Sequence, residues 1–184
     1  MIPDMGLQTN ELPSRWVTRF FPLIEPGGRV LDLACGAGRH ARLLAERGYR
    51  VEAVDRDAGA LASLAGVAGV ATRQADLEGG PWPYHGAAFD GIVVTNYLYR
   101  PLLPLLFNAL EVNGVLIYET FMVGNERFGK PSNPAFLLRP GELPELVRRR
   151  LTVVAFEQGE VNEPRPAVVQ RLCATRRLEP RLPD

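Results

Sequence analysis

The residues best suited to chemistry lie in a glycine-rich turn in the first third of the chain. Residues 30–39 read VLDLACGAGR, an apolar β-rich run that leads through small residues into a helical pattern. Gly36 and Gly38 let the backbone approach a ligand where a Cβ would collide. Unpaired N–H groups at the start of the following helix point the same way. The combination predicts a nucleotide-like ligand above the end of a strand.

Three carboxylates accompany this turn. Asp32 lies in the apolar run, Asp55 ends the second β-rich run, and Asp76 follows the third. A carboxylate in the position of Asp55 can accept hydrogen bonds from both ribose hydroxyls of a nucleoside, and Asp76 can accept one from an adenine amino group. Acids at three successive strand ends, on one rim of a sheet, suit a ligand with hydroxyls, an amine and a positive charge. They do not suit a pyrophosphate.

The elements that must position these residues alternate β-rich runs with helical segments, which is the α/β signature. Two final runs are joined without a helix and predict an antiparallel hairpin at one edge of the sheet. The expected strands cover 29–34, 50–55, 70–75, 89–95, 114–121, 151–156 and 167–175. The expected helices cover 11–24, 38–47, an Ala-rich segment ending at 65, 101–112 and 142–150, with a loop over 76–88.

Length and composition exclude several classes of protein. The 184 residues predict a single domain over 1–184, with a core at about 11–175 and a flexible tail over 176–184. Lys plus Arg and Asp plus Glu number 21 each, so no basic field favours nucleic acid as a partner. Two cysteines and two histidines are too few for a closed zinc site, so we expect no metal. No apolar stretch of membrane-spanning length and no secretory start are present, which predicts a cytoplasmic protein without a membrane partner.

The order of these motifs resembles the class I S-adenosylmethionine-dependent methyltransferases over nearly the whole chain. The resemblance rests on Asp32-x-Ala-x-Gly-x-Gly38, Asp55, Asp76-Leu77 and the closing hairpin. Residues 31–39 (LDLACGAGR), 76–78 (DLE) and 140–143 (PGEL) are similar to the small tellurite-resistance and thiopurine-type branch. Ala34 departs from the commonest motif, which has its first glycine there. The resemblance implies a Rossmann-like three-layer α/β sandwich whose mostly parallel seven-stranded sheet has the order 3-2-1-4-5-7-6, with strand 7 antiparallel.

The resemblance also implies S-adenosylmethionine as the cofactor and assigns residues to it. The backbone of the glycine turn would hold the methionine moiety, and Asp55 would hold the ribose. Arg56 and Leu77 would flank the adenine, and Asp76 would bind the amino group of the adenine. Thr95 and Tyr97 would lie beneath the methyl group, where the acceptor enters. The implied cofactor-binding residues are Asp32, Ala34, Gly36, Gly38, Asp55, Arg56, Asp76, Leu77 and Thr95, and the candidate substrate residues are Tyr97, Asn125 and Arg127.

Three functions remain open at this stage. The first is a methyltransferase in which a small acceptor attacks the methyl group in line, with catalysis supplied mainly by alignment of the two reactants. The second is a non-catalytic S-adenosylmethionine-binding module with a regulatory or assembly role. The third is an NAD-linked oxidoreductase, because 36–41 (GAGRHA) fits the loose pattern G-x-G-x-x-A. Asp32 inside the motif and the terminal hairpin count against the third.

Several residues that could suggest catalysis or ligand binding have simpler structural interpretations. Cys35 fills a tight turn without a base fixed beside it in sequence. His40 is expected in the first turn of a helix, and His85 lies in a Pro/Gly loop without a companion ligand. Trp16 and Phe20 have helical spacing and are expected in the core. The irregular stretch 122–140 is longer than a connector needs to be, so we predict a lid. The acceptor, the oligomeric state and the use of a general base are left undetermined by the sequence.

Overall fold

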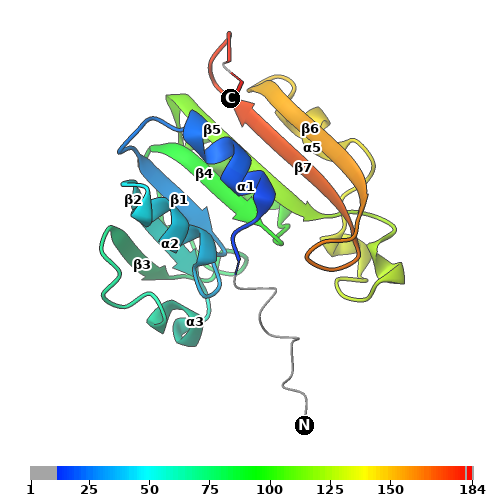
Figure 1. Cartoon of the computed structure of the whole chain (residues 1–184), viewed down its shortest axis with the longest axis horizontal. Coiled ribbons are helices and arrows are strands. Elements are labelled where there is room, and N and C mark those ends of the chain that lie inside the picture. Colours follow the sequence, from blue (N-terminus) through cyan, green and yellow to red (C-terminus); the bar gives the residue numbers. More distant parts are fainter. Residues whose placement is uncertain (1–11, 181, 184) are drawn as a thin grey trace.

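A seven-stranded sheet forms the centre of the molecule in the computed structural model, which describes residues 12–180 and 182–183 (Figure 1). The strand order is β3-β2-β1-β4-β5-β7-β6. Neighbours from β3 to β5 pair in parallel, and β7 runs antiparallel to both β5 and β6. The implied sheet order and the antiparallel hairpin are therefore confirmed.

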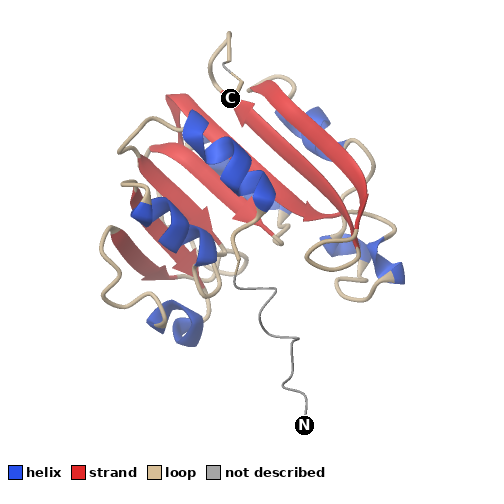
Figure 2. Ribbon diagram, viewed as in Figure 1, coloured by secondary structure: helices blue, strands red, loops and turns tan. Residues whose placement is uncertain are grey.

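The strands and helices alternate along the chain as predicted (Figure 2). The strands are β1 Arg29–Leu33, β2 Arg50–Asp55, β3 Val70–Gln74, β4 Phe89–Thr95, β5 Leu110–Phe121, β6 Thr152–Val161 and β7 Ala167–Thr175. The α-helices are α1 Arg15–Phe20, α2 Arg39–Glu46, α3 Ala58–Ala62, α4 Leu103–Asn108 and α5 Glu142–Val147. Short 3-10 helices occur at η2 Phe21–Leu23, η3 Arg100–Leu102, η4 Asn125–Arg127 and η5 Pro134–Phe136.

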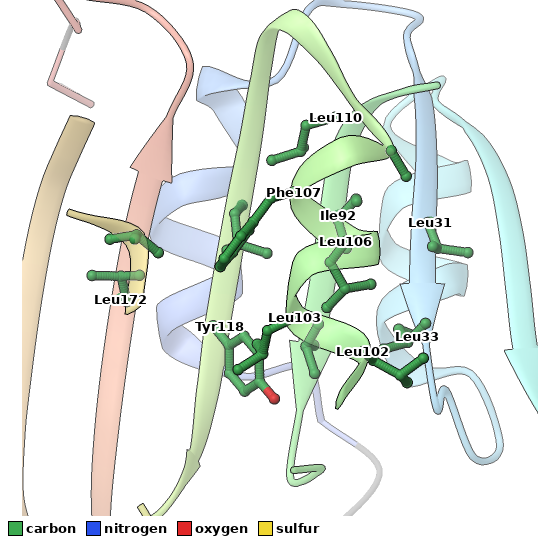
Figure 3. Close-up of a cluster of buried hydrophobic side chains, with 14 of the residues drawn as sticks. Leu31, Leu33, Ile92, Leu102, Leu103, Leu106, Phe107, Leu110, Tyr118 and Leu172 are labelled. Carbon is green, nitrogen blue, oxygen red and sulfur yellow. The ribbon is translucent and has the colours of Figure 1, made fainter. Parts of the chain in front are cut away.

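Helices cover both faces of the sheet and bury one hydrophobic cluster on each. On the first face, Trp16 and Phe20 of α1 and Leu44 of α2 pack with side chains of the central strands. On the second face, α4 lies over the strands, and its residues Leu103, Leu106 and Phe107 belong to the buried cluster between helix and sheet (Figure 3). Because successive side chains of a strand point to opposite faces, Leu31 and Leu33 of β1 join the second cluster and Val30 joins the first. The central strands are thus covered on both sides, as their continuous apolar sequence predicts.

Several helix boundaries differ from the sequence-based prediction. The helix expected over 11–24 begins at Arg15 after a cap, in which Ser14 Oγ accepts from the amides of Trp16 and Val17, and its last turn is the 3-10 helix η2. Residue 11 lies outside the described residues. The helix expected over 101–112 ends at Asn108, because Leu110 already pairs with Phe89 in the sheet.

The segment after β7 also differs from the expected flexible tail at its start. Arg176 donates from Nη2 to the carbonyl of Phe107, and Arg177 pairs with Glu25 at 3.5 Å. The beginning of this segment is therefore held against the fold.

Candidate functional site

A cavity of about 360 Å³ opens at the edge of the sheet where the parallel strands end. Its two halves differ in charge. The first, which we call the charged half, follows β1, β2 and β3 and is lined by Ala34, Asp55, Arg56, Ala75, Asp76, Leu77 and Glu78. The second, which we call the uncharged half, follows β4 and β5 and is lined by Asn96, Tyr97, Leu98, Thr120, Phe121, Pro131 and Phe136.

The glycine-rich turn connects β1 to α2 beside the charged half. Ala34, Gly36 and Gly38 all have positive φ, at 52°, 55° and 76°, a region that glycine adopts without the steric cost that a Cβ brings. A Cβ built on Gly36 would meet nothing within 4 Å, so open space lies over the turn. A Cβ on Gly38 would collide with the side chain of Leu64. Gly36 therefore leaves room for a ligand, whereas Gly38 allows close packing.

Asp55 ties the turn to the end of β2. Its Oδ2 accepts from the backbone amide of Gly36 at 2.8 Å, and its Oδ1 accepts from that of Asp57 at 3.0 Å. Each carboxylate oxygen can accept more than one hydrogen bond. Asp55 can therefore hold the turn in place and still accept from ligand hydroxyls in the cavity.

The remaining predicted residues of the charged half also meet at the cavity. Asp76 is exposed, and the backbone amides of Glu78 and Gly79 lower the pKa of its carboxyl, so it is ionised at neutral pH. Leu77 beside it is buried and offers an apolar surface, while Arg56 is exposed on the other side. These side chains can provide a negative acceptor and an apolar contact to a flat base.

Asp32 does not reach the cavity, contrary to the prediction that three acids share the rim. It is 1% exposed on the face of the sheet that α1 and α2 cover, because the alternation of β1 turns it away from Leu31 and Leu33. Burial raises the pKa of its carboxyl to about 7, against the lowering effects of the Ala41 amide and the positive charge of Arg39. Oδ2 has no hydrogen-bond partner among the described residues. Asp32 therefore lies beneath the glycine turn.

Thr95 and His40 form a second support under the rim. His40 is buried, and its Nε2 accepts from the backbone amide of Ser14 at 3.0 Å. Burial and then the charge of Arg39 lower the pKa of His40 to about 3, so the ring is neutral. The ring proton is then on Nδ1, which lies 3.4 Å from Thr95 Oγ1. Thr95 does not line the cavity, and His40 orients its hydroxyl.

Tyr97, one of the candidate substrate residues, lines the uncharged half. Its backbone carbonyl accepts from the hydroxyl of Tyr118 at 2.8 Å. Its own hydroxyl is buried without a hydrogen-bond partner among the described residues. Burial, and then the charge of Glu78, raise the pKa of Tyr97 far above neutrality. This hydroxyl therefore stays protonated at neutral pH.

The other two candidate substrate residues do not line the cavity. Asn125 is 2% exposed, its Nδ2 donates to the carbonyl of Pro131 at 3.1 Å, and its Oδ1 accepts from the amide of Val168 at 3.2 Å. Arg127 pairs with Glu160 at 3.3 Å on the outside. Their polar groups hold the loop in shape instead of facing the cavity.

Sequence reasoning missed most residues of the uncharged half. Asn96 was findable, because it lies between Thr95 and Tyr97 at the end of an expected strand. It adopts a left-handed backbone conformation with φ of 55°, and its backbone amide donates to the carbonyl of Glu119 at 2.9 Å. Thr120 and Phe121 end β5 in the same way, whereas nothing local in the sequence marks Pro131 or Phe136.

Two kinds of feature are absent from residues 12–180 and 182–183, which the structure describes. There, no helix has the length and apolar character needed to cross a membrane. No group of three or more His, Cys, Asp or Glu side chains is arranged to hold a metal ion.

Part of the chain is similar to known proteins. The model of a methyltransferase domain matches residues 30–111. The curated protein-L-isoaspartate O-methyltransferase of Chlorobaculum tepidum is 36% identical over an alignment of 113 residues, and the match covers 55% of this chain and 49% of the relative. That of Gloeobacter violaceus is 43% identical over an alignment of 101 residues, and the match covers 51% of this chain and 47% of the relative. The chain thus spans about half the length of these relatives.

Solved structures extend the similarity in fold to most of the chain. TehB from Haemophilus influenzae has a TM-score of 0.67 at 20% identity, over 85% of this chain and 59% of that one. A methyltransferase from Methanosarcina mazei has a TM-score of 0.70 at 16% identity, over 91% and 100%. The 1,6-didemethyltoxoflavin-N1-methyltransferase of Burkholderia thailandensis has a TM-score of 0.64 at 21% identity, over 91% and 79%. Residues 30–111 thus match a methyltransferase domain, and the sheet order and these neighbours show that the chain has the fold of class I methyltransferases, TehB among them.

Proposed function

We propose that this chain is an S-adenosylmethionine-dependent methyltransferase that acts on a small-molecule acceptor. The observation that carries the proposal is the cavity at the strand ends, in which a charged half adjoins an uncharged one. The two halves can hold a polar, charged cofactor next to a second molecule of different chemistry. The neighbour from Burkholderia thailandensis supports this division, because its structure contains 1,6-didemethyltoxoflavin together with S-adenosylhomocysteine.

The charged half fits the cofactor on observations of this structure. Open space over Gly36 allows a ligand to approach the turn that also contains Ala34 and Gly38. Asp55 is fixed by two backbone amides and would accept from the ribose hydroxyls. Ionised Asp76 would accept from the adenine amino group. The remaining predicted contacts are Arg56 and Leu77 at the cavity, with Asp32 and Thr95 as supports beneath it.

The chain contributes mainly by positioning the reactants. When bound, S-adenosylmethionine would supply a sulfonium methyl group to a lone pair of the acceptor. The electrons of the broken C–S bond would stay on sulfur, and any proton released by the acceptor would pass to water. The protonated hydroxyl of Tyr97 cannot remove a proton at neutral pH, and no other residue of the uncharged half is titratable. Alignment alone is worth roughly 7–11 kcal/mol of a barrier, so the site can act without a general base.

Ligand binding tests this proposal directly. We expect S-adenosylmethionine and S-adenosylhomocysteine to raise the unfolding temperature of the full chain and NAD to leave it unchanged. A ligand at 100 times its Kd stabilises a protein by about 2.7 kcal/mol. Stabilisation by NAD alone would favour the oxidoreductase.

Turnover then separates an enzyme from a binding module. A screen of small acceptors should show release of S-adenosylhomocysteine above the rate without acceptor. Tight cofactor binding with no turnover across a broad screen would favour the non-catalytic alternative.

A further inference from the structure

The uncharged half of the cavity contains nothing that would neutralise a charged acceptor. Its polar groups among the described residues are neutral, chiefly the amide of Asn96 and the hydroxyls of Tyr97 and Thr120. The rings of Tyr97, Phe121 and Phe136 supply aromatic surface on the same side. Aromatic side chains favour stacked or edge-to-face contact with flat apolar groups. The lining therefore suits an acceptor with a flat, uncharged body.

Glu78 of the adjoining charged half acts on the hydroxyl of Tyr97, whereas two other carboxylates near the uncharged half are engaged elsewhere. Glu119 precedes Thr120 in β5 but points to the opposite face of the sheet, where it pairs with Arg171 at 2.6 Å. Glu142 is 2% exposed and pairs with Arg100 at 2.7 Å. An acceptor with a carboxylate would lose hydration in the uncharged half without gaining a partner of opposite charge, and the charge of Glu78 would repel it.

Pro131 and Phe136 form a wall of the uncharged half, and side chains distant in sequence hold this wall in place. Arg100 donates from Nη1 to the carbonyl of Ala135 and from Nη2 to that of Leu137, each at 2.9 Å. These two carbonyls flank Phe136, which lines the cavity. The guanidinium also binds both oxygens of Glu142, at 2.7 and 3.0 Å. One arginine thus fixes the backbone on both sides of Phe136.

The fixed wall changes the interpretation of the loop over 122–140. Asn125 holds Pro131, the second residue of the wall, because its Nδ2 donates to the carbonyl of Pro131. The backbone of Leu138 donates to the carbonyl of Phe121, and that of Val123 donates to the carbonyl of Leu138. These bonds anchor the loop at its base, so Phe136 forms part of a prearranged wall.

We propose that the uncharged half binds a methyl acceptor with a flat, uncharged body, and that Arg100 is the positioning residue that sets Phe136 against it. This inference rests on the proposed function, because it requires the cofactor in the charged half. Arg100 acts through the backbone of Ala135 and Leu137 and does not itself touch the acceptor. Lysine has no planar fork with five donors, so it cannot reproduce these contacts.

The first experiment compares neutral and charged probes on wild-type protein saturated with S-adenosylhomocysteine. Phenol, aniline and 2-naphthol are the neutral probes, and 4-hydroxybenzoate, 4-aminobenzoate and 6-hydroxy-2-naphthoate are their carboxylates. We expect the neutral probes to bind at least ten-fold more tightly, by ligand-observed NMR titration. Equal or tighter binding of the carboxylates overturns the proposed acceptor class, as does the absence of binding by every neutral probe. Failure of the wild-type protein to bind S-adenosylhomocysteine overturns the proposed function instead.

The second experiment compares two exposed phenylalanines of the same loop. Phe136 is 46% exposed and lines the cavity, whereas Phe128 is 41% exposed and does not. Phe136→Ala should weaken 2-naphthol binding about five-fold or more, and Phe128→Ala should leave it unchanged. Neither change should alter S-adenosylhomocysteine affinity more than two-fold. An equal effect of the two substitutions contradicts the role of Phe136.

Arg100→Lys tests the positioning role itself. We expect a loss of 2-naphthol affinity similar to that of Phe136→Ala, with S-adenosylhomocysteine affinity within two-fold of wild type. Amide hydrogen exchange across 135–137 should become faster, a change that loss of a direct ligand contact would not cause. Unchanged probe binding and unchanged exchange overturn the role of Arg100. If this variant is unstable, Phe136→Ala still decides whether the wall determines acceptor binding.

Discussion

The two halves of the cavity are built in different ways. The charged half comes from one stretch of chain, residues 34–78, whose members follow three neighbouring parallel strands. The uncharged half combines the ends of β4 and β5 with a loop that depends on long-range contacts. Arg100 and Glu142 are 42 residues apart, and Asn125 and Val168 are 43 apart. The half that we propose for the cofactor is thus built from local sequence, while the half that we propose for the acceptor depends on the completed fold.

The largest effect should come from the glycine turn of the charged half. Gly36→Val puts a branched side chain into the open space over the turn, so we expect S-adenosylhomocysteine affinity to fall at least 100-fold, or about 2.7 kcal/mol. Calorimetric titration of the full chain measures this loss. Gly48→Val is the matched control, because Gly48 also has a positive φ and open space but lies after α2, outside the cavity. Equal losses in both variants would attribute the effect to backbone strain.

Asp55→Ala should have the next largest effect. Removing a charged acceptor from ligand hydroxyls costs roughly 1.5–3 kcal/mol, to be measured as the change in S-adenosylhomocysteine Kd. Asp57→Ala is the control: this nearby acid caps α3, so its loss should lower stability and leave the Kd near wild type. Unchanged affinity in a folded Asp55→Ala protein would contradict the ribose assignment.

The charged half was predictable because its signals are local. The bounds of β2 and β4 match the expected 50–55 and 89–95, and Asp55 ends its strand as predicted. Asp32 shows the limit of this approach, because the sequence indicated an acid near a strand end but not the face to which it points. The alternation of β1 makes it a buried support instead of a lining residue.

The loop residues of the uncharged half were not predictable for a physical reason. Asn125 and Arg127 are polar loop residues of the kind that often bind substrates, yet their partners are Val168 and Glu160 of the distant hairpin. Those contacts exist only after β6 and β7 have joined the sheet. Pairing between distant residues also explains the end of the helix expected over 101–112. Leu110 belongs to a strand instead of this helix, because it pairs with Phe89.

Two buried titratable groups beneath the rim of the charged half should show opposite pH dependence. Burial raises the pKa of Asp32 to about 7, so the folded state keeps a proton that the unfolded state loses near pH 4, and this contribution to stability falls as pH rises toward 7. Burial lowers the pKa of His40 to about 3, so its contribution is present above about pH 6.5 and is lost as pH falls. The two effects oppose each other between pH 5 and 6.5.

Single substitutions should separate these two effects. Relative to wild type, Asp32→Asn should lose about 1–2 kcal/mol of stability when the pH is lowered from 6.5 to 5, because only the His40 effect remains. His40→Gln should gain about the same amount over that interval. Urea unfolding at both pH values measures the two changes. Parallel pH dependence in both variants and wild type would show that neither group titrates as described.

The smallest effect tests whether the halves are independent. Asp55 and Phe136 share no hydrogen-bond partner among the described residues, and their supports differ: the glycine turn for one and Arg100 for the other. The effects of substitutions at two sites that share no partner and do not touch each other usually add to within about 0.5 kcal/mol. The loss of S-adenosylhomocysteine affinity should therefore be the same in Asp55→Ala as in the double variant Asp55→Ala/Phe136→Ala. The loss of 2-naphthol affinity should be the same in Phe136→Ala as in the double variant. Calorimetry and NMR titration of wild type, both single variants and the double variant measure the coupling. A coupling above about 1 kcal/mol for either ligand would mean that Phe136 also responds to the charged half, and the wall would then be set by the cofactor as well as by Arg100.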